Sequence, residues 1–244
     1  MSVSTLGIVL RQNKIMGDRR MLTVFTEKLG KVSVSVNGGR GGKSKSSLAY
    51  RPFTLGSYDL YGRGDVYSMG RAEAVRAWYG IGEDVDRYMQ GSFLLEFTDR
   101  LLEEGGPAPG LFALLRDFFD VLETRTKAHS FLAVAYQIKA VRIMGVMPEL
   151  DSCVVCGKKT GDFTFNVEAG GTVCPDCAQY NRLIYTNDSD IISKIKYIAG
   201  TPVRDLGKLY LDAEALSKVS DLVRAYTRCH LDIPNLKSET IITV

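Results

Sequence analysis

Two close pairs of cysteines constrain this chain more than any other feature of its sequence. Cys153 and Cys156 form the first pair, and after 17 intervening residues Cys174 and Cys177 form the second. Two thiolate pairs at this separation can supply four tetrahedral sulfur ligands to one Zn²⁺ ion. Thioredoxin-like redox chemistry would instead need one such pair at a helix start in a βαβ unit, which the surrounding pattern lacks. Because the protein fills all four ligand positions, the spacing predicts a single structural zinc.

The residues around the cysteines favour a small knuckle-and-hairpin unit. Gly157 follows the first pair and Pro175 lies within the second, as tight turns prefer. Between the pairs, FTFNVEAGGTV (163–173) indicates a hairpin with Gly170-Gly171 as its turn. We therefore expect residues 151–180 to form a zinc-binding insertion within a helical region.

Short alternating patterns dominate residues 1–78. The clearest is KVSVSVN (31–37), in which three valines alternate with polar residues, as in a half-buried strand. Similar runs, separated by glycine-containing turns, occur at 6–11, 21–28, 53–62 and 66–75. Five short strands without intervening helices predict a closed β-barrel such as the OB-fold.

From Asp84 the hydrophobic period changes from two to 3.6 residues. Apolar stripes over 89–101, 111–122 and 131–144 predict three helices, and further helices are expected to begin near Ser189 and near Asp212. The predicted fold class is α+β multidomain, a barrel followed by an α-helical bundle with an inserted four-cysteine zinc knuckle. Its expected segments are 1–78 (barrel), 79–150 (first helical part), 151–180 (zinc insertion) and 181–244 (second helical part).

Charge is distributed unevenly along the chain. Residues 1–78 carry 13 Lys and Arg against five Asp and Glu, a net of +8, whereas residues 79–152 carry seven against 12, a net of −5. Such asymmetry is typical of a domain that meets a polyanion. No apolar run approaches the length of a membrane span, and the first residues do not resemble a secretory signal. We expect a soluble, cytosolic protein.

The segment GGRGGKSKSS (38–47) is rich in Gly, Ser and cations and has no apolar or acidic residue. Gly42-Lys43-Ser44 invites comparison with a nucleotide-binding P-loop, but Asn37 stands where that motif needs glycine. A following helix is also not expected, because Pro52 comes within eight residues. The segment instead predicts a nucleic-acid loop in which Arg40, Lys43 and Lys45 supply charge.

Aromatic residues accompany these charges in the barrel sequence. Exposed rings could stack on bases of a single strand, but alternating aromatics in a small barrel belong more often to the core. The six concerned are Phe25, Tyr50, Phe53, Tyr58, Tyr61 and Tyr67.

No credible catalytic centre is visible in the sequence. Cys229 and His230 are adjacent near the end of the last expected helix, where neighbouring side chains point in different directions. His129 is unremarkable, and HExxH and GxSxG motifs are absent from the sequence. We interpret the chain as a non-enzyme.

Several local motifs, in their order along the chain, resemble the bacterial RecO family of recombination and repair proteins. They are GIVL (7–10), LTVFTEKLGKV (22–32), RPF (51–53), LFALL (111–115), GVMP (145–148) and HLDIPNLKS (230–238). Together with the barrel, the helices and the zinc insertion, the resemblance covers essentially the whole chain.

The resemblance implies a mediator of homologous recombination that binds single- and double-stranded DNA and anneals complementary strands. It further implies that the protein acts with RecR to load recombinase onto DNA coated with single-strand-binding protein (SSB), in the bacterial cytoplasm at the nucleoid and without a membrane partner. The predicted DNA contacts are Arg11, Lys14, Arg19, Arg20, Arg40, Lys43, Lys45 and Arg51. For the acidic C-terminal tail of SSB, the predicted site is the basic-rimmed apolar face formed by Ile138, Lys139, Val141 and Arg142.

Other classes of protein share parts of this pattern. A zinc-ribbon protein that binds RNA or acts in transcription would also combine the knuckle with a basic barrel. An NTP-dependent enzyme would require residues 38–47 to bind nucleotide. A pure scaffold between RecR and SSB would leave the charge of the barrel unexplained.

Overall fold

The computed structural model describes two compact units. They comprise residues 1–126 and 127–244, and the structure is described for residues 2–14, 19–37, 45–63, 66–126, 129–178, 189–208 and 211–238. The first unit contains the barrel together with two long helices, α3 and α4, so the unit boundary falls between α4 and α5. The predicted division of the chain at residues 78, 150 and 180 stays a prediction.

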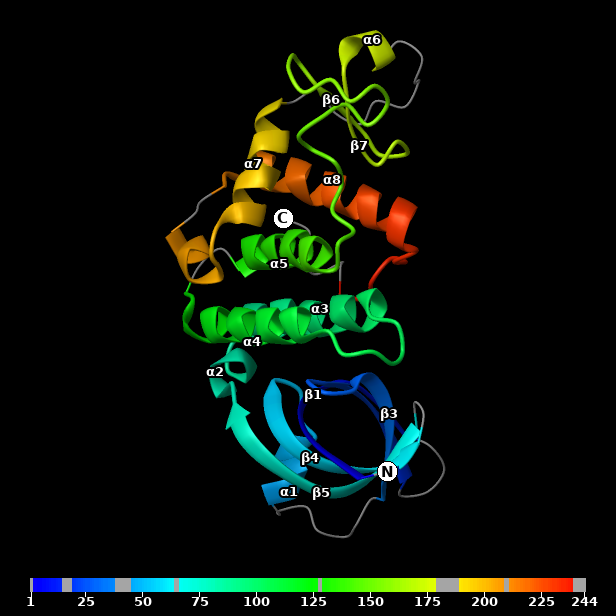
Figure 1. Ribbon diagram of the computed structural model, residues 1–244. Coiled ribbons are helices and arrows are strands. Elements are labelled where there is room, and N and C mark those ends of the chain that lie inside the picture. The colour runs from blue at the N-terminus through cyan, green and yellow to red at the C-terminus, as the bar shows by residue number, and fades with distance from the viewer. Residues whose placement is uncertain are drawn as a thin grey trace. The chain divides into compact units, whose positions relative to one another are not determined.

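The barrel is built from five strands (Figure 1), namely β1 (Ser2–Lys14), β2 (Arg19–Thr26), β3 (Gly30–Asn37), β4 (Thr54–Arg63) and β5 (Val66–Ala77). Their order is β1-β2-β3-β5-β4, and β1 closes the barrel by pairing with β4. Only the β3–β5 pairing among these is parallel. This closed five-stranded arrangement confirms the predicted OB-type barrel.

The register explains how the alternating sequence fills the barrel. Leu22, Val24, Val32 and Val34 are fully buried in its core, and Leu22 pairs with Val34 on neighbouring strands. Register shifts interrupt the β1–β2 and β4–β5 ladders, one of them between Val9 and Arg11. Such bulges increase local bending, which lets long strands curve around a small core.

A short helix, α1 (Lys45–Ala49), corrects the expectation that no helix follows the glycine-rich segment. It packs against β4 and β5, and the hydroxyl of Tyr58 donates to the Ala49 carbonyl oxygen at 2.5 Å. A helix of this length is not stable alone, so its stability comes from packing against β4 and β5, which the Ser-rich sequence does not indicate.

Helices α3 (Val85–Leu101) and α4 (Pro109–Thr124) complete the first unit, after the short helix α2 (Tyr79–Gly82). Asp84 caps α3, because its side chain accepts a hydrogen bond from the Arg87 backbone N–H at 2.8 Å. Aromatic rings join these helices to the barrel: Phe25 with Phe112, Phe53 with Tyr88 and Phe119, and Trp78 with Phe119.

The second unit contains α5 (His129–Ile143), α7 (Ser189–Gly200), the 3₁₀ helix η1 (Val203–Lys208) and α8 (Ala213–Leu231), with α5, α7 and α8 packed against one another. The helices expected from the apolar stripes are therefore confirmed. Between α5 and α7 lies the cysteine-bearing insertion with β6 (Thr164–Asn166), β7 (Gly171–Val173) and α6 (Pro175–Ala178). Among the described helices, none is long and apolar enough to cross a membrane.

Candidate metal centre and nucleic-acid interface

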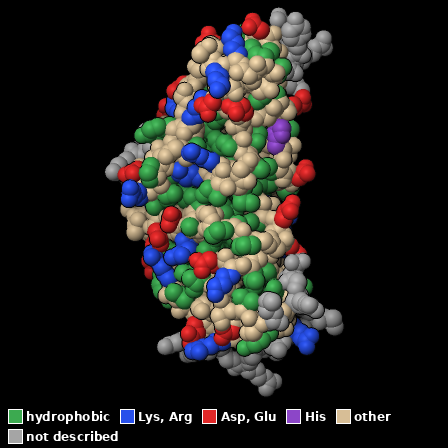
Figure 2. Space-filling view, viewed as in Figure 1, with side chains coloured by type: hydrophobic (Ala, Val, Ile, Leu, Met, Phe, Trp, Pro, Cys, Tyr) green, Lys and Arg blue, Asp and Glu red, His purple; other side chains and the backbone are tan. Residues whose placement is uncertain are grey.

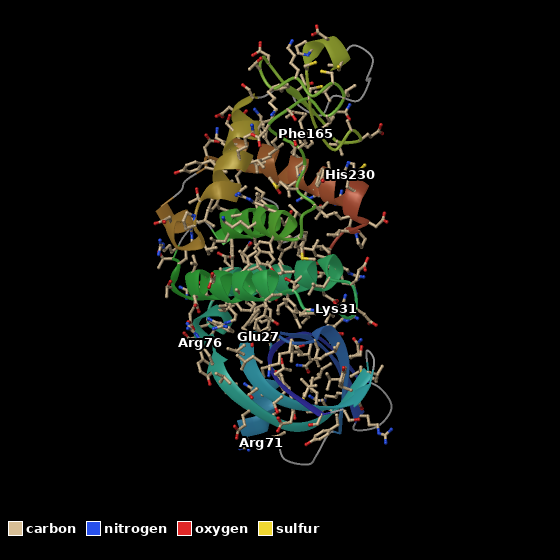
Figure 3. All side chains as sticks on the ribbon, viewed as in Figure 1. Glu27, Lys31, Arg71, Arg76, Phe165 and His230 are labelled. Atoms are coloured by element: carbon tan, nitrogen blue, oxygen red, sulfur yellow. The ribbon has the colours of Figure 1, made fainter. Side chains whose placement is uncertain are left out.

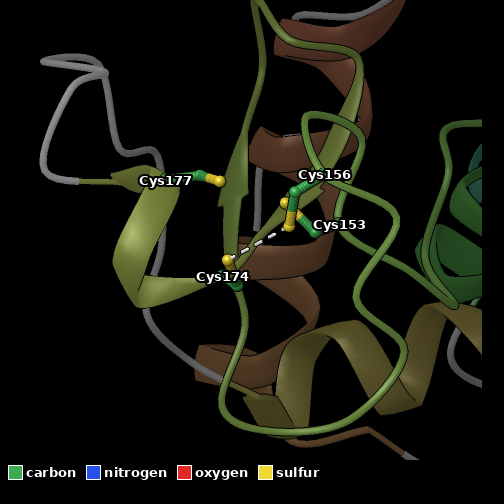
Figure 4. Close-up of side chains that lie close together, drawn as sticks. All are labelled: Cys153, Cys156, Cys174 and Cys177. Atoms are coloured by element: carbon green, nitrogen blue, oxygen red, sulfur yellow. Dashed lines mark hydrogen bonds between the residues drawn. The ribbon is translucent and has the colours of Figure 1, made fainter.

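The four paired cysteines converge in the insertion (Figure 4). Their sulfur atoms all lie within 4.8 Å of one another, although the two pairs are separated by 17 residues of chain. The Sγ atoms of Cys156 and Cys174, one from each pair, are 3.7 Å apart. The predicted ligand set is therefore brought together, and it could hold one metal ion.

Backbone hydrogen bonds shape the knuckle that presents the first pair. The Gly157 N–H donates to the Cys153 carbonyl at 2.8 Å, and the Cys153 N–H donates to the Lys158 carbonyl at 2.8 Å. Gly157 has a φ of 76°, a left-handed conformation that glycine adopts without steric cost. The turn thus directs both thiols of this pair to one side.

The second pair is held by the predicted hairpin and by the start of α6. The Cys177 and Ala178 N–H groups donate to the Cys174 carbonyl at 3.0 and 2.8 Å. Preceding them, β6 and β7 pair in antiparallel fashion, and Gly170 in their turn has a φ of 79°. Val154 donates to the Thr172 carbonyl at 2.9 Å, which ties the first knuckle to β7.

The pKa shifts of the cysteines indicate that the cluster requires a cation. The neighbouring Cys174 thiol raises the pKa of Cys177 to about 12. Burial raises the pKa of Cys153, but backbone N–H donors, those of Cys174 and Cys156 first, outweigh it and lower the pKa to about 6. Four adjacent sulfurs therefore resist becoming thiolates together unless a cation balances their charge. This donor set suits a thiolate-preferring ion and leaves no ligand position for a substrate.

His230 fastens the insertion to α8 (Figure 3). Its Nε2 lies 2.5 Å from the Val167 carbonyl oxygen in the hairpin turn, so this nitrogen donates. The imidazole stacks on Tyr226 at 4.8 Å, and Tyr226 in turn meets Phe165 of β6 edge-on at 6.5 Å. The Tyr226 hydroxyl donates to the Val146 carbonyl at 2.9 Å. His230 is thus a structural contact, which its position beside Cys229 does not reveal.

Some of the predicted DNA contacts lie along β1 and β2. Arg19 and Arg20 are exposed at the start of β2, and Lys14 is the register partner of Arg20. Arg11 is half exposed, with its Nε 3.8 Å from a carboxylate oxygen of Asp99 in α3. Asp99 also pairs with Lys31 at 3.5 Å, so part of the charge of Arg11 is already balanced within the unit.

The remaining predicted contacts belong to the glycine-rich segment and its flank. Arg51 is exposed just after α1, and Lys45 begins that helix. Arg40 and Lys43 lie outside the described residues. The register thus places Lys14 opposite Arg20 on neighbouring strands, and all eight DNA contacts stay predictions.

Other cations of the barrel unit are engaged with acidic groups. Arg71 pairs with Glu73 at 2.6 Å, and Arg76 pairs with Asp120 at 2.8 Å while lying over the Trp78 ring. Figure 2 accordingly shows basic and acidic side chains intermingled on the face that it presents. Net charge alone thus overstates the cationic groups that are available to a polyanion.

The barrel aromatics divide between core and surface. Phe25, Phe53, Tyr58 and Tyr67 are buried, whereas Tyr50 is half-buried. Tyr61 remains 53% exposed on the outside of β4. Core packing therefore accounts for four of the six rings, as their alternating positions favoured.

In the second unit, α5, α7 and α8 enclose a small apolar pocket. Ile138 and Val141 line it, but the cation that follows each of them bonds to the end of α7. Lys139 Nζ donates to the carbonyls of Ala199 and Thr201, and Arg142 donates to the Ala199 carbonyl at 2.6 Å. Burial, and then the charge of Arg142, lower the pKa of Lys139. The full lining is Ile138, Val141, Met147, Pro148, Ile195, Leu222, Val223 and Tyr226.

Comparison with known proteins bears on both units. The family model described as "Recombination protein O N terminal" matches residues 1–78, and "Recombination protein O C terminal" matches residues 82–240. The chain is 26% identical over 231 residues to "DNA repair protein RecO" of Caldanaerobacter subterraneus, covering 95% of this chain and 94% of the relative. Identity to the protein of the same name from Thermoanaerobacter sp. is 27% over 240 residues, 98% of this chain and 96% of the relative. Identity to the protein of the same name from Bacillus pumilus is 30% over 177 residues, which cover 72% of this chain and 69% of the relative.

Proposed function

The chain belongs to the RecO family of DNA repair proteins, and on this premise we propose that it anneals complementary DNA strands as a mediator of recombinational repair. It binds single- and double-stranded DNA and works with RecR to load recombinase onto SSB-coated strands. We propose the bacterial cytoplasm, at the nucleoid, as its place of action.

The observation that carries the proposal is the closed barrel, whose second strand begins with two exposed arginines. Arg19 and Arg20 lie at the start of β2, where Lys14 of β1 is the backbone register partner of Arg20, in a segment of 78 residues with a net charge of +8. Closed barrels of this type offer an outer face and their loops to single strands. Cations there neutralise phosphates and release condensed counterions, which favours binding to any sequence.

Annealing requires no covalent step. Two strands repel each other through their phosphates, and a cationic surface that screens both raises the rate of their encounter. Base pairing then supplies the specificity. We therefore propose a non-enzymatic role, in which the protein lowers a repulsive barrier and forms no reaction intermediate.

We propose zinc as the ion held by Cys153, Cys156, Cys174 and Cys177. Four thiolates at mutual distances below 4.8 Å suit tetrahedral Zn²⁺, which has no redox chemistry and prefers such ligands. When bound, the ion supplies charge balance and a crosslink between the two knuckles. It is proposed as a structural ion, because the protein fills all four positions.

The apolar pocket of the second unit supports a site for the SSB tail. An acidic-hydrophobic tail fits an apolar pocket beside exposed Arg142, with Ile138 and Val141 as pocket wall. Lys139 is buried against α7 and acts mainly on the position of that helix, which carries Ile195 of the wall. The RecR partnership rests on the family resemblance.

Annealing of two labelled complementary oligonucleotides, with and without SSB coating and without ATP, tests the function. We expect acceleration that fades as salt rises, because counterion release drives binding. Competition with RNA of the same sequence separates this proposal from an RNA-binding zinc-ribbon role. Absence of acceleration by folded, metal-loaded protein, or a marked preference for RNA, would contradict the proposal.

The tail site is tested best at Met147, which lines the pocket and is half-buried. Met147→Glu places a negative charge against the acidic tail, and Met147→Gln is the uncharged control of the same size. A labelled SSB tail peptide should bind Met147→Glu more weakly than Met147→Gln. Equal binding to both variants would move the site elsewhere, and charge reversal at Lys139 is avoided because it would disturb α7.

A further inference from the structure

Tyr61 differs from the other barrel aromatics in its position. It lies near the end of β4, beside the β4–β5 connection, and 53% of its surface is exposed. Tyr58, three residues earlier on the same strand, is fully buried in the barrel core.

The ring is seated on a glycine of the neighbouring strand. A Cβ atom built on Gly70 of β5 would lie 2.2 Å from Cε2 and 3.0 Å from Cδ2 of Tyr61, so the ring covers the position that any other residue would fill. One side of the ring is thus supported by the β5 backbone. Half of its surface faces solvent, which leaves a rigidly supported aromatic face open to a ligand.

The register places this ring in one row with small polar residues and with the cationic strands. Across the barrel, Tyr61 pairs with Ser68 of β5, Ser68 with Ser35 of β3, and Ser35 with Met21 of β2. Partners in register point to the same side of a sheet, so the row lies on the outer face. Arg19 follows on that same side of β2, two residues from Met21.

Two acidic side chains of β4 and β5, Asp59 and Glu73, have partners among the described residues. The Asp59 carboxylate accepts a hydrogen bond from Ser4 at 2.5 Å, and Glu73 pairs with Arg71 at 2.6 Å. Arg71 lies on the outside of the barrel (Figure 3) and is largely exposed. Asp59 keeps its charge, because a serine hydroxyl does not neutralise a carboxylate, so a phosphate-bearing ligand approaches the ring from the side of Arg19.

We propose that Tyr61 is a stacking platform for one base of a single DNA strand that crosses the outer face of β4, β5, β3 and β2. The phosphates then run toward Arg19, while Ser68 and Ser35 form a low floor between the ring and this cation. The proposal rests on the proposed function, to which it adds a contact that recognises an unpaired base. In a duplex the bases stack on one another, so the ring has no base face to bind.

The test compares Tyr61→Ala and Tyr61→Phe with Tyr79→Ala, which removes an equally exposed ring from α2. Full-length, metal-loaded proteins are titrated with a labelled single strand and with a duplex of the same length, over a salt series. Tyr61→Ala should lower single-strand affinity by about 5- to 100-fold. Duplex affinity and the salt dependence should not change, because stacking displaces no counterions. Tyr61→Phe and Tyr79→Ala should behave as wild type.

Each other outcome has a definite meaning. If wild-type protein binds single strands and Tyr61→Ala binds them equally well, the platform is wrong while the proposed function stands. If Tyr61→Ala weakens duplex and single strand alike, or lowers the unfolding midpoint of the barrel unit, the ring only covers Gly70 and the platform is again wrong. If wild-type protein binds no DNA, the proposed function fails and the platform with it.

Discussion

The barrel and the cysteine-bearing insertion are stabilised in different ways. In the barrel, five paired strands enclose a continuous apolar core, and aromatic rings such as Phe53 extend that core to the helices. In the insertion, the buried cluster consists of Val173 and the two thiols Cys153 and Cys174, with a few half-buried neighbours. A segment with so small a core cannot offset the entropy of ordering its own chain.

The barrel and the insertion therefore depend on different conditions for their stability. The barrel is stabilised by its own buried apolar side chains and by hydrogen bonds between its strands. With the proposed zinc, the insertion depends on an ion that balances four thiols and on contacts with α8. Loss of the ion should therefore destabilise the insertion and spare the barrel, and loss of core packing should destabilise the barrel and spare the insertion.

Metal removal should produce the largest effect. With Cys174→Ser, or after treatment with a strong chelator, we expect residues 151–178 to unfold locally, because binding of a structural zinc contributes about 10–16 kcal/mol in small zinc domains. Hydrogen exchange followed by peptide should show loss of protection there and full protection in the barrel strands. Cys229→Ser, which removes the exposed fifth thiol, serves as the control.

Two results would contradict this contrast. Protein purified without chelator that contains far less than one zinc per chain would remove the ion from the description. Equal loss of protection in the barrel and in the insertion would show that the two regions do not depend on separate conditions.

Phe53→Ala should produce the next largest effect, now confined to the barrel unit. The buried ring contacts Tyr88 and Phe119 edge-on, and its removal leaves a cavity that costs about 3–5 kcal/mol in the free energy of unfolding. Trp78 is the single tryptophan of the chain and lies beside Phe119, so its fluorescence reports the unfolding of this unit.

Tyr88→Ala is the matched control for Phe53, because its ring touches the same cluster but remains half exposed. We expect a clearly smaller shift in the urea midpoint than for Phe53→Ala. Zinc content should be unchanged in both variants. A Phe53→Ala protein as stable as wild type would show that the barrel core does not depend on this extension.

Features that rest on a repeated sequence pattern can be predicted from the sequence, whereas features that rest on one contact between distant residues cannot. Alternation of Val32, Val34 and Val36 with polar residues identifies a strand whatever its partners, and the paired cysteines identify their own cluster. Phe53, by contrast, has a φ of 56°, a conformation rarely adopted by bulky residues. The packing of the Phe53 ring against Tyr88 and Phe119 accounts for this backbone conformation. No local sequence pattern predicts that packing.

Site residues follow the same division. Arg19 and Arg20 are exposed at the start of β2, and their role as DNA contacts stays a prediction. The pairing of Arg11 with Asp99, and the bonds of Lys139 to the end of α7, join residues 88 and about 60 positions apart. These partners redirect two predicted binding cations toward structural contacts, and neither could be inferred from neighbouring sequence.

His230→Ala should weaken the insertion by less than metal removal does. It deletes one hydrogen bond to Val167 and the stacking on Tyr226, which together are worth about 1–2 kcal/mol. Hydrogen exchange in residues 164–173 should become faster by about 5- to 30-fold, while zinc stays bound. Cys229→Ala, one residue away, should leave this exchange unchanged, and equal acceleration in both variants would assign the effect to the helix end in general.

Arg20→Gln should produce the smallest effect, on DNA affinity alone. A side chain that neutralises one phosphate contributes a slope of about 0.7 for single strands to the dependence of log K on log salt, so its loss should flatten the slope by that amount. Arg76→Gln is the matched control, because Arg76 is held by Asp120 and Glu123 and is expected to contribute no counterion release. If both variants flatten the slope equally, the phosphate contacts depend on the total charge of the barrel unit. If only Arg20→Gln flattens the slope, the path of the strand depends on which cations are already paired with acidic groups, as Arg76 is. The net charge of residues 1–78 does not carry that information.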